Sequence, residues 1–226
     1  MNIVDIIIII FILFGFLIGL KNGFTKQLVT TIGFILAVIL AYILKNPVAS
    51  LFYKVFPFFE FSGYRALNII LYEFLAFAIV FSVLYLILKI LTVSSSIFEK
   101  VLNATIILGI PSKILGAILG VLEYIVVTGI VLFFLCLPVF DLPYVKESKF
   151  ASTMLTKDSF VSKLCNNSLE LYDKIDTLKK DYGRIEDKKV LNEKTVDLLI
   201  EYKVVSKDDV NYLIRNNKLK DVKQKD

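Results

Sequence analysis

Apolar residues dominate four stretches of the first 140 residues, and polar residues dominate the rest of the chain. Residues 1–140 carry 13 Asp, Glu, Lys or Arg side chains, whereas residues 141–226 carry 34. A helix needs about 20 mostly apolar residues to cross the hydrocarbon core of a bilayer. The pattern therefore predicts an all-α membrane protein with four transmembrane helices, at about residues 3–20, 26–44, 68–91 and 112–140.

A shorter amphipathic pattern precedes the fourth predicted span. Ser96 and Glu99 have the spacing of a capping box, and apolar residues recur at helical spacing after Ser96. We expect residues 97–108 to form a short helix lying in the membrane surface, ended by Gly109 and Pro111.

Two connections are predicted between the first three helices. Residues 21–26 are expected to form a short polar turn, so that the first two helices make a tight hairpin. The second helix is expected to end near Leu44, where Lys45-Asn46-Pro47 follows. Segment 48–64 is rich in aromatic residues and favours a loop at the membrane interface. A buried aromatic cluster is the alternative for this segment.

Residues 141–226 are predicted to form a polar, α-helical C-terminal region. Apolar residues recur there at helical spacing, and Ser206 is expected to cap a helix that begins at Lys207. Residues 190–219 therefore predict a small helical hairpin. One alternative makes this tail the functional part and the membrane unit its anchor.

Composition argues against several classes of function. The net charge of +5 is shared between the two parts, and neither part is basic enough to indicate nucleic-acid binding. The chain has no histidine, and Cys136 and Cys165 give neither a disulfide framework nor a metal-ligand spacing. No nucleophile, zinc or phosphate-loop motif is present. The sequence predicts a protein that is not an enzyme and that holds no cofactor or metal.

Glycines recur every four residues in two of the predicted spans. Gly15, Gly19 and Gly23 follow this spacing near the start of the chain, as do Gly116 and Gly120 in the last span. Such glycines let a partner backbone approach closely within a membrane. We expect them to pack the first and fourth helices against each other; the alternative is that they join copies of the chain into a homo-oligomer.

Three carboxylates lie in or near the predicted spans, and they form the candidate polar site. They are Asp5, Glu73 and Glu123, of which Glu123 is the deepest. Intramembrane carboxylates usually face a bundle interior or a wet cavity. A structural, hydrogen-bonded carboxylate is the leading interpretation of Glu123. The alternatives are a proton- or ion-coupled pathway, or an interfacial Glu123 preceded by a re-entrant segment at residues 112–120.

Three motifs, in this order, resemble the colicin V production protein family (the CvpA family) over residues 1–140. The first is an early Asp in the first helix, at Val4-Asp5. The second is the turn Lys21-Asn22-Gly23-Phe24-Thr25-Lys26, of which Lys21, Gly23 and Phe24 carry the match. The third is the small-residue entry to the last helix, from Ile110 to Gly120. Ser112-Lys113 replaces the family's frequent Asn-Arg, and Asn22 separates the basic residue from the glycine.

The resemblance implies a multi-pass protein of the bacterial cytoplasmic membrane that supports production or export of a peptide toxin and envelope homeostasis. It implies a non-enzymatic scaffold whose partners are the bilayer and an envelope or export protein. Some relatives carry an extracytoplasmic protease domain, but this chain lacks the histidine that such a domain needs. The runner-up function is a small oligomeric transporter or channel with Glu123 in its pathway.

The first apolar run is expected to be a retained helix rather than a cleaved signal peptide, because no basic residue precedes it and no A-x-A pattern follows it.

The total number of basic residues on each side of the membrane does not decide the orientation of the chain, but those beside the first helix favour one. Lys21 and Lys26 flank the first helix at its far end, and positive charge favours the cytoplasmic side. We therefore expect both termini outside the cytoplasm.

Overall fold

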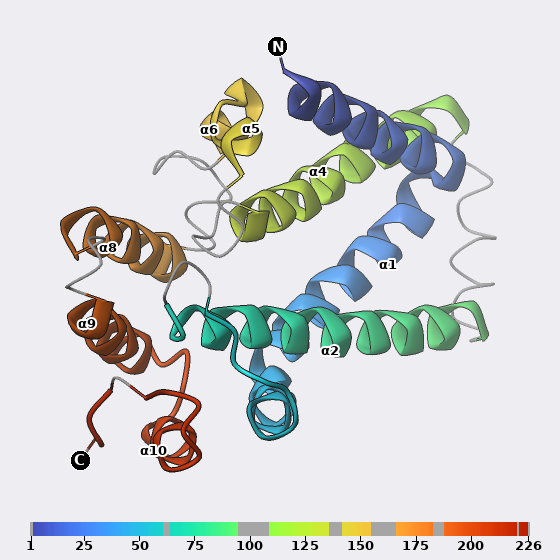
Figure 1. The fold of residues 1–226 in the computed structure, drawn as a ribbon. Helices are drawn as coiled ribbons and strands as arrows, with labels where there is room; N and C mark the ends of the chain where they lie inside the picture. Colours follow the sequence, from blue (N-terminus) through green and yellow to red (C-terminus); the bar gives the residue numbers. More distant parts are fainter. Residues whose placement is uncertain are drawn as a thin grey trace.

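The computed structural model describes residues 2–60, 64–94, 109–135, 142–154, 166–182, 188–220 and 222–225. Within those ranges the regular elements are helices, so the predicted all-α class is confirmed (Figure 1). The long helices are α1 (Ile3–Val55), α2 (Leu67–Ser94) and α4 (Gly109–Leu135). The shorter helices of the described chain are α5 (Pro143–Lys146), α6 (Lys149–Met154), α8 (Asn166–Tyr182), α9 (Lys188–Glu201) and α10 (Lys207–Arg215).

The three long helices are the ones able to cross a membrane by length and composition, among the residues that the structure describes. They are α1, α2 from Leu67 to Ile90, and α4. The first two predicted spans both lie in α1, so the structure has three such helices where the sequence predicts four. Because α1 has 53 residues, its length at about 1.5 Å per residue is roughly 80 Å, more than twice the hydrocarbon core.

A single residue divides α1 into two parts. Gly23 has φ 70° and ψ 172°, and Figure 1 shows the chain changing direction sharply between the dark-blue and light-blue parts of α1. Glycine adopts this φ readily because it has no Cβ atom. The predicted polar turn is wrong in its extent, since residues 21, 22 and 24–26 are all assigned to helix.

The predicted end of the second helix near Leu44 is also wrong. The helix continues past Pro47 to Val55, and Phe56 is its C-cap. Proline inside a helix costs about 3 kcal/mol, because it removes a hydrogen bond and crowds the preceding turn. Burial beyond the proline offsets this cost, since Ala49 and Tyr53 are almost fully buried.

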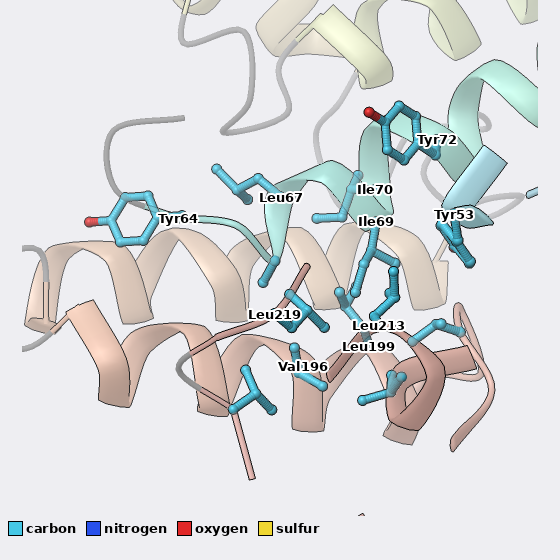
Figure 2. Packing of buried hydrophobic residues seen from close by; sticks show 14 of the residues in the cluster. Tyr53, Tyr64, Leu67, Ile69, Ile70, Tyr72, Val196, Leu199, Leu213 and Leu219 are labelled. Carbon is cyan, nitrogen blue, oxygen red and sulfur yellow. The ribbon is translucent and has the colours of Figure 1, made fainter. Parts of the chain in front are cut away.

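A hydrophobic core joins the end of α1 and the start of α2 to the C-terminal tail (Figure 2). Figure 2 shows Ile69 pointing toward Leu199 and Leu213, from α9 and α10. Residues from both sides of position 140 therefore share one core. Its buried members are Ala49, Tyr53, Tyr64, Ala66, Leu67, Ile69, Ile70, Tyr72, Ala76, Leu171, Ile175, Leu191, Val196, Leu199, Val205, Val210, Leu213, Leu219 and Val222.

The aromatic segment before α2 divides between this core and the surface. Tyr53 and Tyr64 are buried, and Phe52 and Phe58 pack against the core. Phe56 and Phe59 are exposed. The expected interfacial loop is therefore wrong for residues 48–55, which are helical, and the alternative of a buried aromatic cluster describes Tyr53 and its neighbours.

Other sequence predictions concern the ends of helices, and the structure tests two of them. Ser206 caps α10 as predicted, and its side chain accepts a hydrogen bond from the backbone N–H of Asp209. The fourth apolar helix begins at Gly109, so that Pro111 lies in its first turn, where proline is tolerated. The predicted surface helix at residues 97–108 and the end of the fourth span at 136–140 lie outside the described residues.

Candidate functional site

The first part of α1 and the helix α4 cross backbone to backbone at four glycines. A Cβ atom placed on Gly15 would lie 2.7 Å from the carbonyl oxygen of Gly120. One placed on Gly116 would lie 2.5 Å from the carbonyl oxygen of Gly19. Real Cβ atoms do not come so close to other atoms, so any side chain at these positions forces the helices apart. The structure thus brings together the glycines that the sequence singles out in these two helices.

Gly23 connects this crossing to the turn in α1. A Cβ on Gly116 would also lie 2.6 Å from the carbonyl carbon of Gly23. One residue further on, the backbone N–H of Phe24 donates to the hydroxyl oxygen of Ser112, at 3.0 Å. Phe24 is half-buried, whereas Lys21 is exposed. Ser112, which stands where the resembling family has Asn, therefore anchors the turn through its hydroxyl group.

Glu123 is buried in the middle of α4 and accepts two hydrogen bonds from α1. Both reach its Oε2 atom, from Gln27 Nε2 and from Thr31 Oγ1, each at 2.8 Å. Asn22 Nδ2 in turn donates to Gln27 Oε1 at 2.9 Å. The polar chain therefore runs from the turn into the bundle.

Gln27 and Thr31 are not among the predicted site residues, although their spacing in the sequence contains a usable signal. They are four residues apart, so they share a helix face. A polar pair on one face of an apolar helix predicts a polar partner on the neighbouring helix. The alternative of a re-entrant segment before Glu123 is wrong, because α4 is continuous from Gly109 to Leu135.

Glu73 is buried near the start of α2 and contacts the second part of α1. The hydroxyl group of Tyr53 donates to its Oε1 atom at 2.6 Å. The ammonium group of Lys45 forms an ion pair with Oε2. Both Glu73 oxygens are thus bound by groups from α1, and these two contacts hold α1 and α2 together.

Asp5 joins the start of the chain to the segment that follows α4. Its Oδ2 atom accepts from the backbone N–H of Asn2 at 2.8 Å, which completes a capping box. Its Oδ1 atom accepts from the hydroxyl group of Ser148 at 2.6 Å and from the backbone N–H of Phe150 at 3.2 Å. The amide of Asn2 also donates to the backbone oxygen of Tyr144 at 2.6 Å. The N-terminus therefore lies against α5 and the start of α6.

The three carboxylates singled out by sequence do not form one site. Each has its own partners, and the structure places them at three separate helix contacts. In the described ranges, no three His, Cys, Asp or Glu side chains lie close enough to hold a metal ion. At each of the three contacts the carboxylate accepts hydrogen bonds that hold neighbouring segments of the chain together.

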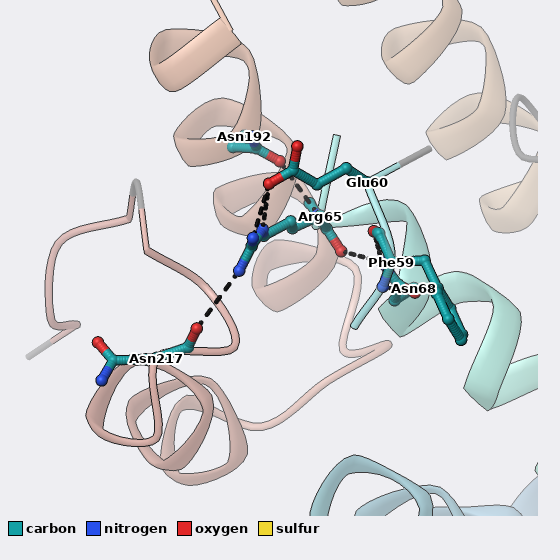
Figure 3. Close-up of polar contacts among 7 residues, drawn as sticks. Phe59, Glu60, Arg65, Asn68, Asn192 and Asn217 are labelled. Atoms are coloured by element: carbon teal, nitrogen blue, oxygen red, sulfur yellow. Dashed lines mark hydrogen bonds and ion pairs between the residues drawn. The ribbon is translucent and has the colours of Figure 1, made fainter. Parts of the chain in front are cut away.

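Polar contacts also attach the tail to the connection between α1 and α2 (Figure 3). Asn192 Oδ1 accepts from the buried backbone N–H of Ala66 at 3.0 Å. Arg65 donates to Glu60 Oε1 at 2.6 Å and to the backbone oxygen of Asn217 at 3.4 Å. The hydrogen bond from Arg65 to the Glu60 carboxylate, together with the positive charge of Arg65, lowers the pKa of Glu60 below its ordinary value.

Lys218 caps the C-terminal end of α1 from the tail. Its ammonium group donates to three backbone oxygens, those of Tyr53 at 2.6 Å, Phe56 at 2.8 Å and Lys54 at 3.0 Å. The last carbonyl groups of a helix have no partner within the helix, and a cation at that end also interacts favourably with the helix dipole. Partial burial lowers the pKa of Lys218 from its ordinary value.

Replacing Lys218 with methionine is expected to loosen the tail from the membrane unit. Hydrogen bonds to a charged group contribute about 1.5–3 kcal/mol, and a 1.4 kcal/mol loss raises an opening equilibrium tenfold. Amide hydrogen exchange in residues 188–219 of the full chain should accelerate by about tenfold or more. Lys220→Met, at an exposed tail lysine, is the control. Equal exchange rates in the two variants would contradict this function of Lys218.

Known proteins with similar sequences show the family to which this chain belongs. A family model described as colicin V production protein matches residues 4–159. The uncharacterized transmembrane protein YshB of Bacillus subtilis (strain 168) is 35% identical over 133 residues, covering 57% of this chain and 75% of that protein. No solved structure matches the chain. The family match extends beyond residue 140 and includes α5, which Asn2 contacts, and α6, which Asp5 contacts. The chain is a membrane protein that belongs to the colicin V production protein family.

Proposed function

We propose that this chain is a non-enzymatic scaffold of the bacterial cytoplasmic membrane that supports peptide-toxin production or export and envelope homeostasis. In this proposal the chain crosses the bilayer four times, because α1 crosses once on each side of Gly23. The part after Gly23 contains 21 residues from Phe24 to Leu44 without a charge other than Lys26. At about 1.5 Å per residue that stretch is roughly 31 Å long, close to the thickness of the hydrocarbon core.

The glycine crossing is the observation that carries the scaffold proposal. Gly15 and Gly19 contact Gly116 and Gly120 through backbone atoms. The two helices therefore leave no space for a solute between them at this crossing. Glu123, the deepest carboxylate, has partners on α1. Such a bundle offers outer faces to a partner protein more readily than an internal path to a solute. Because the glycine faces contact each other, we propose that any self-association uses a different face.

The scaffold proposal is tested by copurification together with deletion. A full-length tagged chain, extracted in mild detergent from its native membrane, should recover an envelope or export protein. Deletion of the gene should lower resistance to envelope stress or the yield of a secreted peptide. Recovery of no such protein, with unchanged stress resistance and secretion after deletion, would contradict the proposal.

The second candidate function is a small oligomeric transporter or channel. The polar chain from Asn22 through Gln27 to Glu123 is the observation that favours it. Glu123→Gln preserves the shape of the side chain and removes its charge, so it should abolish proton or ion flux in proteoliposomes while the chain still folds. Unchanged flux in that variant would exclude Glu123 from any pathway, and absence of flux in the wild type would exclude transport of the tested ions.

We propose that both termini lie outside the cytoplasm. The charges at Lys21 and Lys26 support this orientation, because they flank the far end of the first helix. A variant with Cys136→Ser retains Cys165 in the tail as its single thiol. A membrane-impermeant maleimide should label this variant in intact cells, whereas a variant without both cysteines should stay unlabelled. Labelling only after lysis would place the tail in the cytoplasm and reverse the proposed orientation.

A further inference from the structure

A cavity of about 380 Å³ lies at the seam between the membrane helices and the tail. Asn46 of α1 and Glu73 of α2 line one side, and the turn between α9 and α10 with the start of α10 lines the other. Its volume is within the range of cavities that hold small ligands. The tail residues that line it are Ile200, Lys203, Val204, Val205, Ser206, Lys207 and Asp209.

The position of this cavity along α1 corresponds to the membrane surface. The apolar stretch that ends at Leu44 is long enough to cross the hydrocarbon core, so the next residues, Lys45 and Asn46, lie at its edge. The ion pair with Lys45 holds Glu73 at the same level. Beyond this level, α1 continues to Val55 and is covered by the tail. A cavity lined by Asn46 and Glu73 therefore lies among the lipid headgroups.

The charged groups of the lining have both signs. Lys203 and Lys207 contribute two ammonium groups, and Asp209 contributes a carboxylate whose Oδ2 atom accepts from Ser50 at 3.0 Å and from Ser206 at 2.7 Å. Lys45 neutralises Glu73. The cavity therefore combines cations, which attract a phosphate group, with the carboxylate of Asp209, whose other oxygen, Oδ1, can accept a hydrogen bond from a ligand.

The backbone turn between α9 and α10 brings the two lysines of the lining close together along the chain. Lys203 has φ 55°, a left-handed conformation that is uncommon for a residue other than glycine. The turn is closed by the backbone N–H of Val204, which donates to the carbonyl oxygen of Leu199 at 2.9 Å. Ser206 then starts α10, so that Lys207 follows within four residues of Lys203. Strained backbone of this kind is retained where the surrounding structure requires it.

We propose that this cavity binds the headgroup of a phospholipid that has both a phosphate and a hydrogen-bond donor. Lys203 and Lys207 face the phosphate, and Asp209 accepts from the ammonium group of phosphatidylethanolamine or the hydroxyl groups of phosphatidylglycerol. Phosphatidylcholine carries the same phosphate, but its trimethylammonium group has no N–H to donate. The site thus recognises lipids at the seam of the membrane unit and the tail; its place in the membrane rests on the four crossings proposed above, but not on the scaffold function.

Native mass spectrometry of the full chain, delipidated in detergent and offered each lipid, tests the proposal. Phosphatidylethanolamine or phosphatidylglycerol should be retained with at least tenfold higher affinity than phosphatidylcholine. The double variant Lys203→Gln/Lys207→Gln should bind all three lipids at least tenfold more weakly, because the phosphate that the two lysines face is common to them. The matched control Lys220→Gln/Lys223→Gln removes the same charge from tail lysines that do not line the cavity, and it should keep the wild-type affinities for all three lipids.

Three outcomes would overturn the proposal. One is equal retention of all three lipids by the wild type. Another is an equal loss of affinity in both double variants, which would indicate a general effect of tail charge. The third is competition by inorganic phosphate at the concentration at which the lipid binds, because the cavity would then be a site for free phosphate.

Discussion

Replacing Gly19 with alanine is expected to destabilise the helix bundle by about 3 kcal/mol or more. The added Cβ atom would overlap the backbone of Gly116 and lie 2.8 Å from Ala117 Cα. Overpacking of an interior usually costs about 1–3 kcal/mol, and a clash with backbone is at the upper end because backbone cannot rotate away. The two helices must separate, which also removes the neighbouring contact of Gly15 with Gly120.

Gly33→Ala is the matched control for this prediction. Gly33 also lies in α1, but a Cβ atom placed there meets nothing within 4 Å. Alanine is the better helix former, so this variant should stay within about 1 kcal/mol of the wild type, on the stable side. Unfolding by a denaturing detergent, followed by circular dichroism, measures both variants. Similar midpoints for Gly19→Ala and Gly33→Ala would contradict the backbone crossing.

Replacing Lys45 with methionine is expected to cost about 3–5 kcal/mol, the range for breaking a buried ion pair. The side chains of Lys45 and Glu73 are only 12% and 8% exposed. Methionine keeps the apolar length of lysine but leaves the carboxylate of Glu73 without a cation. The same unfolding experiment should show a much lower midpoint, and the contact between α1 and α2 should be the first to open.

The double variant Lys45→Met/Glu73→Gln should recover most of that loss. Glutamine carries no charge, and its carbonyl oxygen still accepts from the hydroxyl group of Tyr53. Replacing both members of a buried pair by neutral groups is often nearly neutral for stability. A double variant as unstable as Lys45→Met would show that the ion pair is not the source of the loss.

The apolar helices and the glycine spacing were predictable, because lipid and close packing impose strong, local patterns on a sequence. The break between the first two helices was harder to predict. Lys21, Asn22 and Lys26 are polar enough to indicate a turn, but one residue, Gly23, is sufficient to change the direction of the chain. Helix geometry continues on both sides because the polar side chains find partners or solvent without leaving the helix.

The end of α1 was mispredicted because its stabilising contacts are distant in sequence. Pro47 is normally a strong signal for a helix end. The residues that stabilise the helix beyond Pro47 are in the tail. Lys218 caps the last carbonyl groups of α1, and Leu213 and Leu219 cover its buried face. The partners of Glu123 were missed for the same reason, since Gln27 and Thr31 lie more than 90 residues away.

The core that joins α2 to the tail has a consequence for the order of biosynthesis. Ile69 leaves the ribosome long before Leu219, its partner in the same core. Roughly 150 residues separate them, so at about 5–20 residues per second the delay is roughly 8 to 30 s. During that interval the end of α1 and the start of α2 present an uncovered apolar surface to membrane chaperones and proteases. The nascent chain is therefore most vulnerable to degradation after its helices have inserted and before its last residues have been synthesised.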